Sequence, residues 1–305
     1  MSGAPTKPLL QRLDGIDRRW IFLLMALSVA GPILWVGVTG KTFPETPTPA
    51  VRGAFDAIDR LPEGARVLIS FDFDPASAGE LQPMATALVH HCALRKLRIY
   101  GMTLWAPGSP IIGATLNDVI AGDPWYRYGE TWVDLGFQSG NEGVIKQMGA
   151  DLAKTYPNDS RGTPVARIPM MQGVSRTADF DLLISISAGY PGSKEWVQYA
   201  VSPTLTGDKP LPFVTGTTGV QTPQLIPYYP RQMAGILGAI KGAAEYETLV
   251  NDAARGGDPS KPVPAKFQEA QRRMAPQLFA HVLMVGLILV GNAIFLFGRG
   301  KGVRA

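Results

Sequence analysis

The sequence predicts an α/β fold, a doubly wound and mostly parallel sheet (Rossmann/flavodoxin-like) flanked by two transmembrane helices. Three observations lead to this prediction. Five short segments rich in β-branched and aromatic residues alternate with helical patterns between residues 63 and 250. Parallel neighbouring strands need a crossover between them, and the helical patterns supply it. Two uncharged apolar stretches, residues 20–38 and 278–297, enclose this region.

The two apolar stretches have the length of membrane spans. A helix needs about 20 apolar residues to cross a hydrocarbon layer roughly 30 Å thick. The first span contains Gly31 and Pro32, which predict a kink. Its small residues 28–30 resemble a signal-peptide cleavage site, but apolar sequence continues to Val38 and favours an uncleaved anchor.

The distribution of charge predicts the orientation of these spans. The chain is 46% hydrophobic and 18% charged, with a formal net charge of +4. The tails outside the spans carry seven basic and two acidic residues, which leaves 22 basic and 23 acidic residues between the spans. By the positive-inside rule both termini are cytoplasmic, so we expect an inner-membrane protein with an extracytoplasmic central domain. The nearly neutral middle argues against a nucleic-acid partner.

The chain therefore divides into seven parts. The prolines of residues 41–49 indicate an extended spacer, and the Gly- and Pro-rich segment 251–264 indicates a linker. The predicted parts are a cytoplasmic tail (1–19), the first span (20–38), the spacer with a short amphipathic helix (39–62), the α/β domain (63–250), the linker with a juxtamembrane helix (251–277), the second span (278–297) and a cytoplasmic tail (298–305).

Within the domain, strands and helices are expected to alternate. Apolar residues at helical spacing predict the first helix, and β-branched runs predict the strands. The expected strands are 66–73, 97–105, 131–137, 180–187 and a weaker 211–215. The expected helices are 50–61, 81–96, 110–122, 141–156, 194–200 and a long one over 230–250.

Polar residues that follow the strands are candidate ligand contacts. In open α/β sheets, ligands bind beyond the carboxyl ends of the strands. This rule selects Asp72, Asp74, Ser77, Ser139 and Thr217. For Asp74 and Ser77 the favoured interpretation is structural, a turn or a helix cap, because Ser77 and Glu80 have the spacing of a capping box.

The pair Asp72 and Asp74 resembles the DxD motif of the haloacid dehalogenase phosphatases. The resemblance implies a nucleophile at Asp72 and an acid/base at Asp74. It covers one strand only, and the position two residues after the second Asp is Ala76, where the family has Thr or Val. The later acidic residues Asp179 and Asp181 precede their strand, whereas the family places such a pair at a strand's carboxyl end. No catalytic residue is therefore assigned, and an Asp-dependent hydrolase is the second alternative function.

The sequence predicts neither a metal site nor a cofactor. His90, His91 and Cys92 are consecutive on an expected helix, so their side chains point about 100° apart and do not converge on one ion. No GxGxxG follows the first strand, and the Gly-rich residues 216–219 lack the lysine of a Walker loop.

Two features indicate protein contacts. Trp125, Tyr126 and Tyr128 form an aromatic segment of the composition found at interface centres, although they could equally pack on their own sheet. Asn292 is a polar residue within the second span, where such residues usually bond across a helix interface. Small residues over 232–246 suggest close helix packing, most simply against the domain's own sheet.

These observations together predict a non-enzymatic subunit or scaffold of a membrane protein assembly. Its expected partners are membrane lipid and either other membrane proteins or further copies of the chain. Two anchors restrict the orientation of the domain, which suits a fixed place in an assembly. The first alternative is a domain that binds or senses a small ligand in the cleft at the strand ends.

Overall fold

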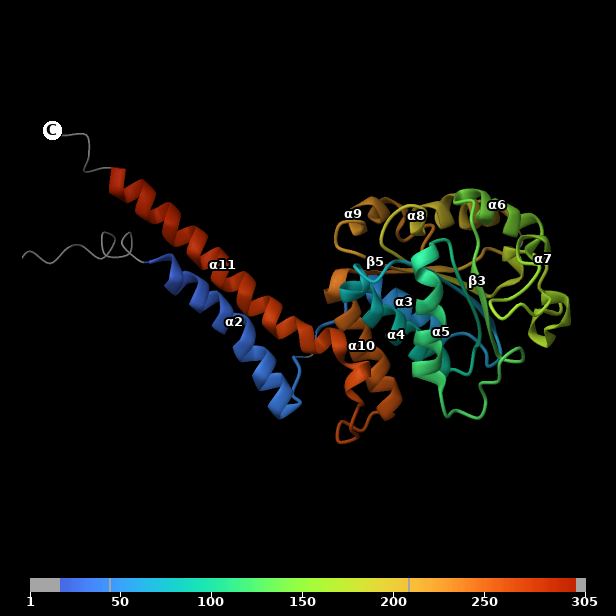
Figure 1. The fold of residues 1–305 in the computed structure, drawn as a ribbon, viewed down its shortest axis with the longest axis horizontal. Helices are drawn as coiled ribbons and strands as arrows, with labels where there is room; N and C mark the ends of the chain where they lie inside the picture. The colour runs from blue at the N-terminus through green and yellow to red at the C-terminus, as the bar shows by residue number, and fades with distance from the viewer. Residues whose placement is uncertain (1–16, 44, 208, 300–305) are drawn as a thin grey trace, which may run out of the picture. The chain divides into compact units, whose positions relative to one another are not determined.

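The computed structural model describes residues 17–43, 45–207 and 209–299, with residues 297–299 described as backbone only. The chain forms two compact units. Among the described residues, one consists of 17–43 and 272–299, and the other is the α/β unit of residues 45–207 and 209–271. Figure 1 shows the elements of both units.

The α/β unit is built on a six-stranded parallel sheet with the order β3-β2-β1-β4-β5-β6. The chain order reverses between β1 and β4, as in doubly wound sheets. The strands are β1 (Arg66–Asp72), β2 (Arg98–Thr103), β3 (Trp132–Phe137), β4 (Leu182–Ser187), β5 (Phe213–Thr217) and β6 (Gly235–Gly238). The predicted fold class is confirmed.

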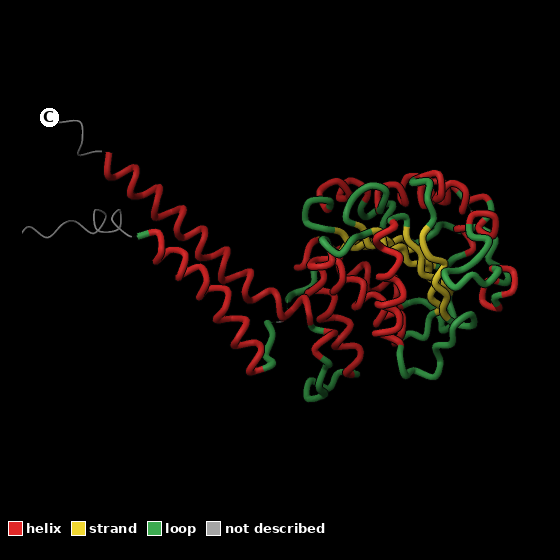
Figure 2. Tube along the Cα trace, viewed as in Figure 1, coloured by secondary structure: helices red, strands yellow, loops and turns green. Residues whose placement is uncertain are grey.

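Helices cover both faces of the sheet (Figure 2). On one face α4 packs between α5 and α10, and α3 packs on β6. On the other face α6 and α8 pack together, and α8 contacts β4. The helices of the first face are α3 (Pro49–Asp59), α4 (Ala78–Leu94), α5 (Ser109–Ile120) and α10 (Ala239–Arg255); the others are α6 (Glu142–Ala150), α7 (Leu152–Thr155), α8 (Ser193–Trp196) and α9 (Thr222–Leu225).

Burial on both faces explains why the strands are continuous apolar runs. Every residue of β4 is buried, and so is every residue of β1 after Arg66. A parallel sheet between two helical layers has no face for water, so the strands do not alternate polar and apolar residues. Aromatic side chains fill much of the interior. For example, the ring centroids of Tyr100 and Phe180 lie 5.0 Å apart in an edge-to-face arrangement.

The sequence prediction was wrong at the end of the sheet. Residues 235–238 form strand β6 inside the stretch predicted as a helix, and α10 begins only at Ala239. A Cβ on Gly235 would lie 2.2 Å from the backbone nitrogen of Ala54, and one on Gly53 would lie 2.3 Å from the Ala234 oxygen. Small residues here therefore allow the backbones of β6 and α3 to approach closely.

The other unit contains the apolar helix α2 (Arg18–Thr39) and, from Arg272 onward, the apolar helix α11 (Glu269–Arg299). Both are long and apolar enough to cross a membrane. Their large apolar side chains are mostly exposed, for example Trp20 at 67% and Leu289 at 64%. Core helices of a soluble protein would bury such side chains, so these two are compatible with insertion into a membrane.

Candidate functional site

Three polar residues end adjacent strands at the carboxyl edge of the sheet. Asp72 is paired in register with Ser187, and Ser187 is paired with Thr217. The fold thus brings Asp72 and Thr217 to one edge, as the strand-end rule predicts. All three side chains are completely buried. They line the interior of the domain and expose no surface to a ligand.

Asp72 is the centre of a buried hydrogen-bond network. One carboxylate oxygen accepts the backbone N–H of Leu104 at 2.8 Å, and the other accepts the Ser70 hydroxyl at 2.7 Å and the Trp196 indole N–H at 3.1 Å. Burial raises the pKa of Asp72 to about 7, against the opposing effect of these bonds. The carboxylate therefore ties β1 to the start of the next loop and to α8.

A loop closes over these strand ends. The indole of Trp105 donates to the Pro191 oxygen at 2.7 Å, and the Gln221 amide donates to the Gly189 oxygen at 3.1 Å. A Cβ on Gly192 would lie 1.9 Å from the Ser187 hydroxyl, so only glycine fits there. The remaining amide oxygen of Gln221 is buried without a hydrogen-bond partner among the described residues. These hydrogen bonds hold the loop of residues 189–192 to the segments that follow β2 and β5.

The other predicted contacts lie apart from this edge. Asp74 is in a turn and accepts the backbone N–H of Ser77 at 2.9 Å, as the structural interpretation expects. The Ser77 side chain makes no capping bond, and Glu80 instead accepts the Gly219 N–H at 2.9 Å. Ser139 is exposed after β3, and β2 separates that strand from β1.

The aromatic segment packs within its own domain. Tyr126 is buried, and its hydroxyl donates to the backbone oxygens of Cys92 and Leu97. Tyr128 donates to the Asp159 carboxylate at 2.7 Å, and the edge of Trp125 meets Tyr126. These contacts give the segment a structural role, and its role in a protein interface stays a prediction.

Helix α10 holds the segment through which the chain enters the α/β unit. Glu245 is 2% exposed, and one of its oxygens accepts both the backbone N–H of Thr48 at 2.9 Å and its hydroxyl at 2.8 Å. Thr48 is the residue before α3. The Lys241 ammonium lies 3.8 Å from the other oxygen. We call this contact the entry joint.

The same helix holds the segment through which the chain leaves. Glu247 is 1% exposed, and its two oxygens accept the backbone N–H groups of Ala270 and Gln271, each at 2.9 Å. These N–H groups belong to the first turn of α11 and have no acceptor within their helix. The Asn251 amide also donates to the Phe267 oxygen at 2.7 Å. We call these contacts the exit joint.

Sequence reasoning missed both joints. Their one visible signal is two acidic residues, Glu245 and Glu247, in the middle of a helix whose neighbours are Ala, Tyr and Leu. Acidic side chains are almost never fully buried unless they are paired. A sequence alone does not reveal their burial, because the partners lie about 200 residues before Glu245 and about 20 residues after Glu247.

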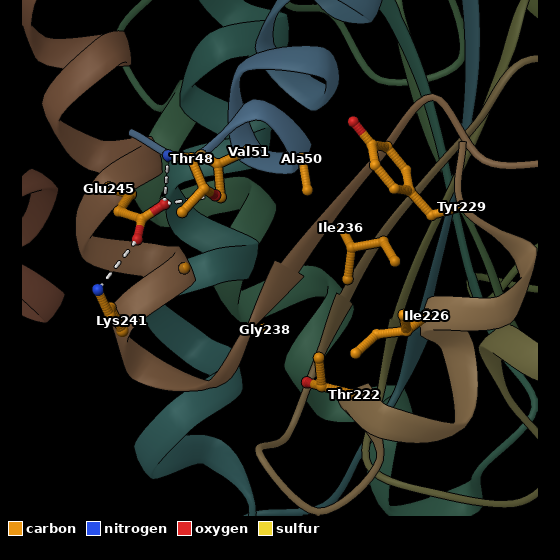
Figure 3. A pocket seen from close by; sticks show the side chains of 11 residues that line it. Thr48, Ala50, Val51, Thr222, Ile226, Tyr229, Ile236, Gly238, Lys241 and Glu245 are labelled. Atoms are coloured by element: carbon orange, nitrogen blue, oxygen red, sulfur yellow. Dashed lines mark hydrogen bonds and ion pairs between the residues drawn. The ribbon is translucent and has the colours of Figure 1, made fainter. Parts of the chain in front are cut away.

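A cavity of about 380 Å³ lies beside the entry joint, next to the outer strand β6. Figure 3 shows Thr48 and Glu245 on one side of it and Tyr229 and Ile226 on the other. Its lining is mostly apolar and includes Ala50, Val51, Thr222, Ile236 and Lys241. The volume is at the small end of the range for small-molecule sites.

Comparisons with known proteins do not identify a family. No protein-family model matches the chain, and no curated protein matches it. Among solved structures, the crystal structure of AibC is similar over 76% of this chain and 51% of that chain, with 15% sequence identity and a TM-score of 0.29. The matched region is thus about half the length of AibC, and a likeness of this degree does not bear on function.

Proposed function

We propose that this protein is a non-enzymatic subunit or scaffold of a membrane protein assembly, anchored in the cell membrane by α2 and α11. Both termini are cytoplasmic and the α/β domain is extracytoplasmic, as the positive tails favour. Other membrane proteins or further copies of the chain are its partners.

The observation that carries this proposal is the pair of joints on α10. Glu245 fixes the entering segment and Glu247 fixes the leaving one, each through two hydrogen bonds to a buried carboxylate. Charge-assisted hydrogen bonds in a buried setting are stronger and more rigid than exposed ones. A domain tied in this way keeps one orientation relative to its connecting segments, which an assembly component needs.

The geometry offers less support for catalysis. Asp72, the candidate nucleophile, is enclosed by Ser70, Leu104 and Trp196 and has no exposed surface. A nucleophile must reach its substrate within hydrogen-bond distance. A hydrolase that uses Asp72 would first have to open the core.

The test is the size and composition of the protein extracted in mild detergent. Native mass spectrometry of the full chain is expected to show more than one chain per particle, identical or different. The double variant Glu245→Ala/Glu247→Ala should weaken this association, because the domain no longer keeps one orientation, while the domain stays folded by circular dichroism. Glu130→Ala, whose side chain is 56% exposed, is the matched control. A lone monomer with no co-purifying chain would overturn the proposal.

A small-ligand binding domain is the second candidate, and the cavity at the edge of the sheet favours it. Ligand binding to the folded state raises the melting temperature. A compound from a screen that acts through this cavity should lose its effect in Ala50→Phe, where the larger ring fills the space. Loss of the effect in Asp74→Ala instead would place the ligand at the strand ends.

A further inference from the structure

Helix α11 exposes a polar residue within its apolar stretch. Asn292 is exposed, and its side-chain amide has no hydrogen-bond partner in the described part of the chain. The surrounding residues 282–296 carry no charge. In hydrocarbon an unpaired amide is unfavourable, so such residues bond to a neighbouring helix.

The chain's own α2 does not supply this partner. Phe279 of α11 lines a cavity together with residues of α2. Farther along the helix, the partly covered positions are Leu283, Gly286, Leu287, Ala293 and Ile294. At 100° per residue, Asn292 is about 200° around the helix from Ile294. At the same angle per residue it is about 140° from Phe279, so the amide lies on the exposed face of α11, away from the partly covered positions.

The uncovered face has the spacing of a helix-pairing seam. His281, Val285, Ile288 and Asn292 follow one another at intervals of four, three and four residues. All four are exposed, with Val285 at 56% and Ile288 at 57%. A repeat of 3.5 residues keeps one seam facing a partner helix in a left-handed pair.

We propose that this seam binds a second copy of the chain, so that two α11 helices pair in parallel with their Asn292 amides in contact. Copies inserted in the same direction present the same residues at the same depth. An amide carries both a donor and an acceptor, so two Asn292 side chains satisfy each other across a twofold axis. This inference rests on the proposed function and names its partner in the membrane.

Cysteine cross-linking in native membranes tests the seam. Cys92 is the chain's one cysteine and is buried, so a Cys92→Ala background gives clean single-cysteine variants. On oxidation, Val285→Cys, Ile288→Cys and Asn292→Cys should form covalent dimers. Leu287→Cys and Ile294→Cys, on the partly covered face of α11, are the matched controls. Dimers at the control positions only, or at no position, would overturn the proposal.

A dilution measurement tests the amide itself. Energy transfer between labelled full-length chains in detergent should show dimers about threefold to thirtyfold weaker for Asn292→Leu, with Asn292→Gln restoring part of the loss. An unchanged Asn292→Leu dimer would contradict the proposal. If the protein co-purifies with a different membrane protein but never cross-links to itself, this inference fails and the proposed function stands. A wild-type monomer without any partner contradicts both.

Discussion

The carboxyl edge of the sheet and helix α10 use buried carboxylates for different purposes. Asp72 joins three elements of the core to one another, and its partners are all inside the domain. Glu245 joins the core to the residue before α3, and Glu247 joins it to the first turn of α11. Asp72, at a strand end where a ligand site is expected in this fold, thus bonds within the domain, and the polar groups that bear on the proposed function lie on a helix.

The largest predicted effect is a change in the free energy of unfolding with pH, caused by the buried carboxyl of Asp72. The pKa of Asp72 in the folded state, about 7, is above its unfolded value of about 3.9. The folded state therefore binds the proton more tightly, and the contribution of this group to stability falls as pH rises from about 4 to about 7, by up to about 4 kcal/mol. Urea unfolding across this range measures it.

The control for this slope is Asp72→Asn, which holds no titrating proton. Its free energy of unfolding should lack the Asp72 contribution between pH 4 and pH 7. A wild-type slope identical to that of Asp72→Asn would show that the carboxyl is not desolvated, and the strand ends would again become a candidate for ligand contact.

Substitution of Gly235 should have the next largest effect. In Gly235→Ala the new methyl would meet the backbone of Ala54, which cannot rotate away, so we expect a loss of about 2–3 kcal/mol. Gly79→Ala is the control, because a Cβ there meets nothing within 4 Å. Thermal unfolding of both variants checks the prediction. Equal melting temperatures would mean that α3 does not lie against β6.

Removal of the exit joint should destabilise the connecting segment more than the core. Glu247→Ala leaves two backbone N–H groups of α11 without their acceptor, a change comparable to the loss of a helix cap at about 1–2 kcal/mol. Limited proteolysis should then cut residues 256–268 faster than in the wild type. If Glu130→Ala raises cleavage equally, the effect is not specific to the joint.

The smallest effect is expected at the amino ends of the strands, where Asp181 precedes β4. Lys209 bonds to Asp181 at 2.8 Å, but its side chain is 60% exposed. An exposed ion pair contributes about 0–1 kcal/mol, so Lys209→Ala should barely change the unfolding midpoint. A loss larger than that of Glu247→Ala would show that exposure is a poor guide to the role of polar groups in this protein.

The sequence was sufficient for most of the fold, because long apolar runs such as residues 66–73 can only be buried strands when helices alternate with them. It was insufficient for β6, since four residues with two glycines carry no strand pattern and are followed by residues that suit a helix. It placed Asp72 and Thr217 at one edge of the sheet. Their burial depends on Trp196 and on the loop of residues 188–192, and such distant contacts leave no local pattern.

Hydrogen exchange of the full chain in nanodiscs tests the central claim most directly, because it reads the joints amide by amide. The amides of Thr48, Ala270 and Gln271 should exchange as slowly as those inside α10, since each donates to a buried carboxylate. Exchange at these three amides as fast as in residues 257–263 would show that the two joints do not hold these segments, and would contradict the account.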